Sequence, residues 1–449
     1  MQSNCLEEMK NNHRIHLCLA KMSDNGMEQR YIQEAFDTNW VAPLGPNVDA
    51  FEKDLECYMN ENAGQARNDD PLSKHVAALS SCTAAIHIAL LLLGVEKGDE
   101  VICQSFSFCA SSNPVIYCGA KPVFVDSEEE TWNMSPELLE AAIKDRIAKT
   151  GRKPKAIIVV DLYGMPAQWD EITAISRKYD IPVIEDAANA LGSYYKGKPC
   201  GTFGDIATLS FNGNKIITTS GGGALVCKDE ETKKRAIFLA TQAKEPHLHY
   251  EHEVIGYNYR MSNISAGIGR GQMTVLEDHI KHHKHVHELY SELFAKVLPR
   301  TVLIGGGDPI IAGEDPVIAG EDPRSHKVFN SNFWLTTILF KQELDTEALC
   351  LELDKAGIEA RPLWKPMHLQ PVYKDAPAYI NGVSEKLYKT GICLPSGPWV
   401  DDEDVEYIAT EVMKISYLRE KDNKDSIPEE KWVYDEESIV GFWNTSRGY

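Results

Sequence analysis

The stretch LSFNGNKIITTSGGG spans residues 209–223 and sets one lysine on a tight turn. A β-rich segment, Ile206 to Phe211, leads into Asn212-Gly213-Asn214, which is a strong turn signal, and β-branched residues and three glycines follow. A lysine on such a turn is held by the backbone and directed inward. Taken alone, Lys215 would still be interpreted as a solvated surface residue, because most lysines are.

A second segment upstream changes that interpretation. Residues 181–190, IPVIEDAANA, are typical of a buried strand that ends in acids and continues in small residues. A carboxylate at the end of such a strand, Asp186, followed later by Lys215 on its turn, suits pyridoxal phosphate. The aspartate would keep the pyridine nitrogen protonated, and the lysine would bind the cofactor covalently. The alternative is a surface lysine and a salt-bridged aspartate.

A phosphate site is predicted near residue 80. The short apolar strand Val76 to Leu79 is followed by Ser80 to Ala85, where serines and small residues open a helix. Free backbone N–H groups at a positive helix end can bind a phosphate, with the Thr83 hydroxyl as a further donor. The alternative is an ordinary helix cap. Phe108, just beyond another strand, can stack on a planar ring, although such a residue is more often part of the core.

The fold class follows from the order of elements between residues 76 and 223. Strands alternate with helices, which predicts an α/β fold with a mostly parallel sheet and right-handed crossovers. Ligands of such sheets bind at the carboxyl ends of the strands, where the candidate residues Thr83, Phe108, Asp186 and Lys215 fall.

The chain of 449 residues is long enough for two domains. The predicted divisions are an N-terminal arm (1–26), a large domain (27–288), a small α+β domain (289–417) with a loop insertion (305–325), and a charged extension (418–449). The insertion holds the tandem repeat PIIAGED and PVIAGED, which is too short for a solenoid.

Composition and charge exclude several classes of partner. A net charge of −21 argues against nucleic acid and anionic membranes, yet permits an anionic small substrate at a local basic site. We find no apolar signal region and no stretch near the ~20 apolar residues of a membrane helix, so a cytoplasmic protein is expected. The eleven cysteines, without paired CxxC motifs, are interpreted as reduced core residues.

A histidine-rich helix near residue 280 has the spacing that a metal site requires. His279, His283 and His287 share one face by their spacing. Because no carboxylate or cysteine partner set accompanies them and lysines interleave, we interpret this face as solvated and predict no metal.

With these segments placed, residues 15 to 417 resemble the DegT/DnrJ/EryC-type sugar aminotransferases, which are pyridoxal phosphate enzymes of fold type I, the aspartate aminotransferase-like fold. The matching stretches, in the order of the family, are Ser80–Ala85, Glu185–Ala188, Phe211–Gly223, Gly256–Met261 and Arg361–His368. The third and fifth resemble a sub-group whose members aminate C4 of UDP-2-acetamido-2,6-dideoxy-4-keto-hexoses.

This resemblance implies a role for each matching residue. Lys215 would bind the cofactor and carry the proton, and Asp186 would pair with the pyridine nitrogen. The remaining implied positions are stacking by Phe108, phosphate binding by Thr83, the backbone of Ala84 and Ser210, contacts across a homodimer by Asn258 and Arg260, and nucleotide-sugar contacts by Trp364, Lys365 and His368.

Two residues depart from the family pattern. Cys82 replaces the glycine that is usual in the phosphate turn, and Asn189 stands where many relatives have histidine, glutamine or glutamate, near the cofactor or the substrate amine. A lysine at position 215 weighs against the dehydratase branch of the family, which has histidine there.

The resemblance implies glutamate as amino donor, a nucleotide-linked keto-sugar as acceptor and active sites shared between two subunits. Two alternatives stay open. The acceptor could be another keto-sugar, linked to dTDP or GDP, or a keto-cyclitol. The chain could also be a cofactor-binding regulatory protein without turnover, although a protein of that kind has no need to keep both Lys215 and Asp186.

Overall fold

The computed structural model describes residues 14–62, 73–297, 302–304, 310–311, 328–340 and 343–422. Residues 1–13 of the predicted arm and 423–449 of the predicted extension lie outside these ranges. The predicted insertion also lies outside them, except for residues 310–311.

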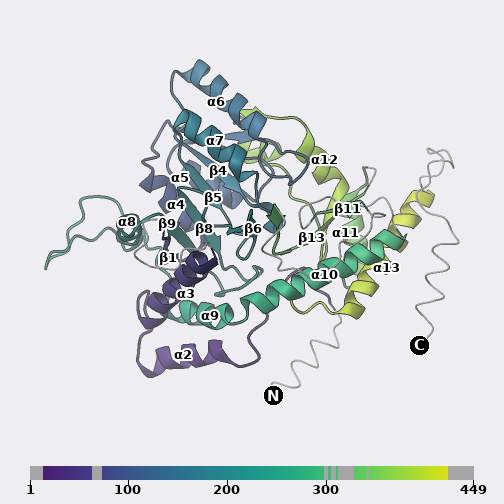
Figure 1. Ribbon diagram of the computed structural model, residues 1–449, viewed down its shortest axis with the longest axis horizontal. Helices are drawn as coiled ribbons and strands as arrows, with labels where there is room; N and C mark the ends of the chain where they lie inside the picture. The colour runs from purple at the N-terminus through teal and green to yellow at the C-terminus, as the bar shows by residue number, and fades with distance from the viewer. Residues whose placement is uncertain are drawn as a thin grey trace.

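The largest layer is an eight-stranded sheet in the order β1-β9-β8-β5-β4-β2-β3-β15 (Figure 1). Neighbouring strands are parallel from β8 to β15, and only the pairs that involve β9 are antiparallel. This confirms the predicted α/β sheet. The strand bounds are β1 His75–Leu79, β2 Glu100–Gln104, β3 Lys121–Val125, β4 Ala156–Val160, β5 Val183–Asp186, β8 Ile206–Ser210, β9 Gly223–Cys227 and β15 Ala378–Tyr379.

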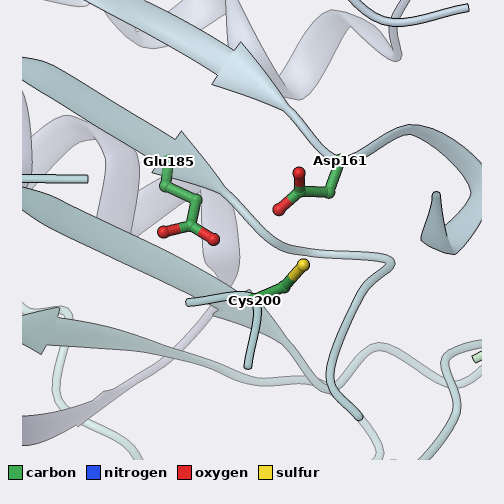
Figure 2. Close-up of side chains that lie close together, drawn as sticks. All are labelled: Asp161, Glu185 and Cys200. Carbon is green, nitrogen blue, oxygen red and sulfur yellow. The ribbon is translucent and has the colours of Figure 1, made fainter. Parts of the chain in front are cut away.

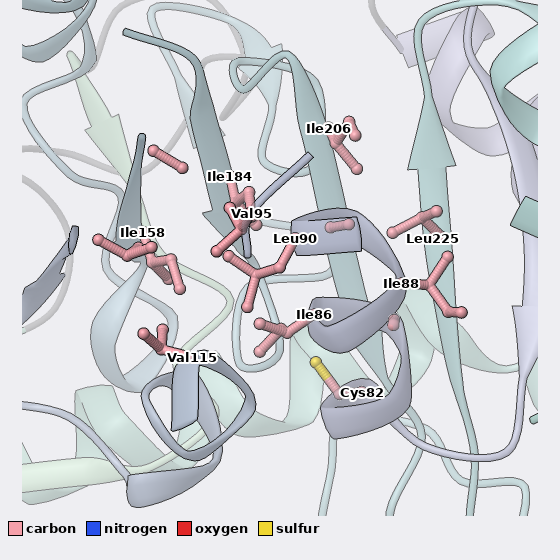
Figure 3. Packing of buried hydrophobic residues seen from close by; sticks show 14 of the residues in the cluster. Cys82, Ile86, Ile88, Leu90, Val95, Val115, Ile158, Ile184, Ile206 and Leu225 are labelled. Carbon is pink, nitrogen blue, oxygen red and sulfur yellow. The ribbon is translucent and has the colours of Figure 1, made fainter. Parts of the chain in front are cut away.

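Helices cover both faces of this sheet. On one face, Ile86 and Leu90 of α4 pack with Ile184 of β5 (Figure 3). On the other, Leu139 of α6 packs with Val183 of β5. Because successive strand residues point to opposite faces, Asp186 shares the α4 face with Ile184, whereas Glu185 lies on the α6 face. The helix bounds are α4 Cys82–Leu92, α5 Asn113–Tyr117, α6 Pro136–Thr150, α7 Trp169–Tyr179 and α8 Glu230–Ala240.

Capping residues explain where several helices begin. Ser81, Ser135 and Asp229 each accept a hydrogen bond from a backbone N–H of the first turn of their helix. The helices α2 and α3 precede β1 along the chain, and α9 and α10 come after β9 and α8. Their bounds are α2 Met27–Asp37, α3 Pro46–Asn62, α9 Asn263–Met273 and α10 Leu276–Val297.

The C-terminal part forms a second sheet, in the order β11-β10-β13-β16-β14. In Figure 1, α10 runs from beside α9 toward this sheet and lies along α13, against which its Tyr290 and Phe294 pack. The bounds are β10 Val302–Ile304, β11 Ile310–Ile311, β13 Thr336–Leu339, β14 Arg361–Pro362, β16 Gly391–Leu394, α11 Thr346–Lys355, α12 Val383–Thr390 and α13 Asp402–Asp422. A small third sheet joins β12 Phe329–Asn330, β6 Tyr194–Tyr195 and β7 Lys198–Pro199.

The α10 helix passes through the predicted boundary at residue 288, so the division into domains stays a prediction. Strand β13 begins at Thr336, after Phe333, which has a left-handed backbone with φ of 56°. Within the described part of the chain, no helix is both long and apolar enough to cross a membrane.

Candidate active site

Asp186 ends β5 and is 3% exposed. Its Oδ2 accepts a hydrogen bond of 2.6 Å from the Ser111 hydroxyl, and its Oδ1 accepts one of 3.1 Å from the Ala188 backbone N–H. Burial raises the pKa of this carboxyl, and the donors oppose the rise by stabilising the anion. Asp186 is thus a buried carboxylate with a fixed orientation.

Lys215 lies on the turn after β8, where its backbone N–H donates to the Asn212 carbonyl over 3.0 Å. Its Nζ donates to Asn189 Oδ1 over 2.5 Å and lies 4.1 Å from the centroid of the Trp334 ring. Burial lowers the pKa of the Lys215 amine to about 8, against the attraction of nearby Asp186. The amine is therefore near the pH at which proton transfer in both directions is efficient.

The predicted phosphate turn is the N-terminus of α4. Ser81 caps it, and the Ala84 backbone N–H donates to Ser81 Oγ over 3.0 Å, so a phosphate would have to share or displace that acceptor. Thr83 is partly exposed, and Ser210, at the end of β8, is buried. Gly223 allows β9 to pass this turn closely, because a Cβ there would lie 2.3 Å from the Cys82 backbone nitrogen.

Cys82, the departure from the glycine of the family, is accommodated because its side chain turns inward (Figure 3). Its sulfur lies 3.8 Å from Asp186 Oδ1 and 3.5 Å from Thr208 Oγ1. Burial raises the pKa of this thiol, so it is a neutral weak donor to the carboxylate. The ten described cysteines are all free thiols.

A series of aromatic contacts leads from Trp334, beside the lysine, to Phe108. Phe108 is 57% exposed, and its ring centroid lies 5.9 Å from that of Trp364. Trp364 in turn lies 4.7 Å from Tyr163 and 6.3 Å from Trp334. The structure thus brings Phe108 and Trp364 together with two aromatic residues that were not predicted for the site.

Three residues at the site were missed by sequence reasoning. Tyr163 lies three residues after the end of β4, which was a usable signal, and its φ of 54° is unusual for a tyrosine. Ser111 lies in the short 3₁₀ helix Cys109–Ser111 that Phe108 caps, so its proximity to Asp186 depends on the fold. Trp334 lies far along the chain and carried no signal for this site.

The other residues implied by the family resemblance have varied surroundings. Asn258 is exposed, but Arg260 is 8% exposed and its Nη1 contacts Glu52 and, at 2.8 Å, the Ala78 carbonyl. This guanidinium is thus held within its own chain, and the contact of Arg260 across a dimer stays a prediction. Lys365 is exposed.

His368 is largely buried in its side chain and bonded at both ring nitrogens. Its Nδ1 lies 2.7 Å from Ser105 Oγ, and its Nε2 lies 3.3 Å from a Glu385 oxygen. These contacts anchor the Arg361–His368 stretch beside the loop that carries Phe108.

One cluster with metal-ligand side chains occurs among the described residues, on the opposite face of β5. Asp161, Glu185 and Cys200 are buried, and their ligand atoms lie within 4.8 Å of one another (Figure 2). The two oxygens of Glu185 already accept three backbone N–H groups, from Gly201, Phe203 and Gly204.

Burial raises the pKa of all three of these groups, because it disfavours their charged forms. A proton on one of the groups is the simplest way to lower the charge of the cluster. Asp161 Oδ1 accepts from Ala167 and Trp169, and within the described residues its Oδ2 has no hydrogen-bond partner. A protonated Asp161 beside ionised Glu185 removes most of the repulsion without a cation. We therefore interpret this cluster as structural.

The expectation of a solvated histidine face on α10 is wrong. His279, His283 and His287 are at most 7% exposed. They face inward because α10 packs against the lysine turn and the segment before β13. His279 Nδ1 lies 3.0 Å from the Ile216 carbonyl, and the ring centroid of His287 lies 4.7 Å from that of Phe333. Burial lowers the pKa of His279 and His283.

The donor set fits pyridoxal phosphate. An amine of lowered pKa, an oriented buried carboxylate, an exposed aromatic ring and a capped helix N-terminus meet at the carboxyl ends of the strands. A sheet of this topology with such a site defines a pyridoxal phosphate-dependent aminotransferase of fold type I.

Comparison with known proteins identifies the family. The model of the DegT/DnrJ/EryC1/StrS aminotransferase family matches residues 23–413, and the chain belongs to that family. EpsN of Bacillus subtilis (strain 168), which carries a provisional description as a pyridoxal phosphate-dependent aminotransferase, is 45% identical over 395 residues, 87% of this chain and 93% of that protein.

Two further proteins extend the comparison. GDP-perosamine synthase of Escherichia coli O157:H7 is 35% identical over 387 residues, 86% of this chain and 95% of that enzyme. The crystal structure of a DegT DnrJ EryC1 StrS aminotransferase from Brucella abortus superposes with a TM-score of 0.73 at 29% identity, over 87% of this chain and 95% of that one.

Proposed function

We propose that this aminotransferase moves the amino group of L-glutamate to C4 of a nucleotide-linked 4-keto-6-deoxy sugar, with a UDP-2-acetamido-2,6-dideoxy-4-keto-hexose as the favoured acceptor. The observation that carries the proposal is that Lys215 and buried Asp186 lie close enough at one end of the sheet for the carboxylate to act electrostatically on the amine, in a chain of this family. The favoured sugar rests on the likeness of residues 212–223 and 361–368 to one sub-group.

Two side chains supply the proton chemistry. Bound pyridoxal phosphate provides a carbonyl that takes up the amino group and a ring that absorbs negative charge. Lys215 Nζ, with its pKa near 8, carries the proton between the reacting carbon atoms. Asp186 holds the proton on the ring nitrogen, and Ser111 and Ala188 keep its carboxylate oriented.

The phosphate and the ring are held by other residues. Thr83 and Ser210, with the N-terminal turn of α4, would bind the phosphate, and the Ala84 N–H would join them if it left Ser81. Phe108 would cover one face of the ring, which matches its exposure and its place next to Trp364.

The sugar would approach from the small-domain side. Trp364 and exposed Lys365 would contact the nucleotide sugar, and His368 would fix the stretch that carries them, since both its ring nitrogens are bonded. We further propose a homodimer in which exposed Asn258 reaches the neighbouring site. Arg260 is left out of this set because Glu52 holds it.

A GDP-linked 4-keto sugar is the second candidate acceptor, because GDP-perosamine synthase is 35% identical to this chain over most of its length. The two candidates differ in nucleobase and in the substituent at C2 of the sugar. Either would place the new amine at the same carbon.

Two measurements test the proposal. Borohydride reduction and peptide mapping should place the pyridoxyl label on Lys215, and a label on Lys196 or Lys228 would overturn the assignment. UDP-, GDP- and dTDP-linked 4-keto sugars, each supplied with glutamate, should then be compared by the rate of 2-oxoglutarate formation, with NMR of the product. A markedly faster rate with a GDP or dTDP sugar would replace the favoured acceptor.

A further inference from the structure

Trp334, two residues before β13, covers the turn that carries Lys215. Its indole Nε1 donates to the Asn214 carbonyl over 2.6 Å, and its ring face covers the Lys215 amine at 4.1 Å. The side chain is buried, at 2% exposure, and its ring also lies beside Tyr163 at 6.5 Å. Trp334 thus touches both the backbone before Lys215 and the amine itself.

Asn189 contacts the same amine. Its Oδ1 accepts the hydrogen bond of 2.5 Å from Lys215 Nζ. The Lys215 amine is therefore held by one amide oxygen and one aromatic face, which come from segments 145 positions apart in the sequence, at residues 189 and 334. Both partners favour a charged amine.

One buried side chain ties these two partners together. Asn332, which is fully buried, donates from Nδ2 to the Asn189 carbonyl over 2.8 Å, and its Oδ1 accepts from the Trp334 backbone N–H over 2.9 Å. Phe333, between Asn332 and Trp334 in the chain, has the left-handed φ of 56°. This conformation costs free energy in a bulky residue and persists only where the surroundings impose it. The position of Trp334 relative to Asn189 is therefore fixed.

We propose that Asn189 and Trp334 form a holding site for the free amine of Lys215 during turnover, in which Trp334 is a positioning residue. The inference rests on the proposed role of Lys215 and deepens it. Transamination requires the lysine to leave the cofactor and wait beside it while it carries a proton. The holding site supplies a defined place for that amine.

The chemistry of the two partners suits this task. An amide oxygen and an indole face stabilise an ammonium group, but neither takes its proton at neutral pH. The proton consequently stays on Lys215 until the reacting carbon accepts it. A histidine or glutamate in place of Asn189 would compete for that proton.

Other ionisable groups face the amine and are the same in all variants below. They are Asp186 from β5, Cys82 from α4 and Cys18 from the segment before α2. Burial raises the pKa of both thiols, that of Cys18 to about 12, so they are neutral near pH 8 and Asp186 supplies the negative charge.

The test measures the ionisation of Lys215 in the holoenzyme. Full-length protein converted to the amino form of the cofactor with glutamate is treated with an amine-acylating anhydride across a pH series. Mass spectrometry of the peptide that contains residue 215 then reports the apparent pKa of that lysine. For the wild type we expect a midpoint of about 8.

Trp334→Leu should lower that midpoint by about one pH unit, because the aromatic face no longer stabilises the ammonium. Trp334→Phe, which keeps a ring, should recover most of the shift. Asn189→Leu removes the other partner and should lower the midpoint independently. In stopped-flow experiments, the half-reaction of Trp334→Leu with glutamate should be about tenfold slower than that of the wild type. The glutamate concentration that gives half of the maximal rate should change little.

Trp399→Leu is a matched control. Trp399 also donates through Nε1 to a backbone carbonyl, that of Ala20, and also has a lysine amine, that of Lys21, 5.5 Å from its ring. Its replacement should leave the Lys215 midpoint unchanged. An equal shift in Trp399→Leu would attribute the effect to general loosening and overturn the inference.

Two failures are distinguishable. If borohydride does not label Lys215 in the wild type, the proposed function is wrong. If the label is on Lys215 and the midpoints of Trp334→Leu and Asn189→Leu equal that of the wild type, only the holding site is wrong. Should Trp334→Leu not fold, Trp334→Phe and Asn189→Leu still decide, since the Asn189 variant tests the site from its other side.

Discussion

Two adjacent carboxylates of β5 have different surroundings. Glu185 and Asp186 are both buried, but they point to opposite faces of one sheet. Glu185 accepts three backbone N–H groups, which occupy its oxygens with fixed structure. Asp186 has side-chain donors and lies in the same site as Lys215. Although both carboxylates are buried, backbone donors therefore occupy the oxygens of Glu185, whereas Asp186 is available to the site that contains Lys215.

Two partly buried lysines, Lys215 and Lys233, show a similar contrast. Lys215 has an amide and an aromatic ring as neighbours, and its pKa falls to about 8 because burial dominates. Lys233 loses water as well, but Glu52 and Glu56 more than offset this, and its pKa is raised. The comparison teaches that the partners decide whether a buried amine can exchange its proton near neutral pH.

The largest expected effect separates the two lysines. Lys215→Ala should lower turnover at least about 10³-fold, since both the covalent anchor and the proton carrier are lost. Lys233→Ala should lower stability but leave the rate for each bound cofactor within a few-fold of wild type. The measurement is steady-state transamination normalised to bound pyridoxal phosphate. Comparable losses in the two variants would remove the distinction drawn here.

The two carboxylates should separate next. Asp186→Asn should retain the cofactor yet slow the glutamate half-reaction on the order of 10²-fold, because an amide cannot hold the proton of the ring nitrogen. Glu185→Gln should instead lower the free energy of unfolding by about 2 kcal/mol, since its NH₂ group would face backbone donors. Stopped-flow absorbance and chemical denaturation measure the two effects. Near-normal half-reaction rates in Asp186→Asn would show that another residue holds the ring nitrogen.

The proposed dimer makes a third, smaller effect measurable. Lys215→Ala and Asn258→Ala subunits, each inactive alone, should recover about a quarter of wild-type activity when mixed and allowed to exchange, because one site of each mixed dimer would be intact. Arg260→Ala is the informative companion. Because Glu52 holds the Arg260 guanidinium in the wild type, Arg260→Ala should lower the stability of the protein. Its mixture with Lys215→Ala should show no specific recovery of activity. No recovery with the Asn258 variant would contradict the shared site.

The smallest effect concerns stability and pH in the cofactor-free protein. The pKa of Lys215 is about 8 when folded, below its ordinary value of 10.5, so the folded state loses its proton first and stability rises as pH increases from 8 toward 10.5. Lys215→Met should therefore raise Tm by about 2 °C at pH 7, and the gain should shrink above pH 8. Lys233→Met should lower Tm at pH 7, because the raised pKa of Lys233 marks a stabilising charge. The same sign for both variants would contradict the comparison.

The sequence by itself determined the parts whose signals are local. The strand end at Asp186, the turn of Lys215 and the opening of α4 follow from hydrophobic runs, turn residues and caps over about ten positions, and the structure has all three. The alternation of strands and helices likewise predicted the mostly parallel sheet, and the order of matching stretches predicted the family.

Only the tertiary structure decided which distant side chains meet. Trp334 and Ser111 reach the site because the segment before β13 and the 3₁₀ helix after Phe108 pack there. The sequence around each residue contains no pattern that predicts this packing. The histidines of α10 turned out to be buried and Arg260 to be paired with Glu52 for the same reason. Periodicity predicts which residues share a face, but what covers that face depends on contacts between segments far apart in sequence.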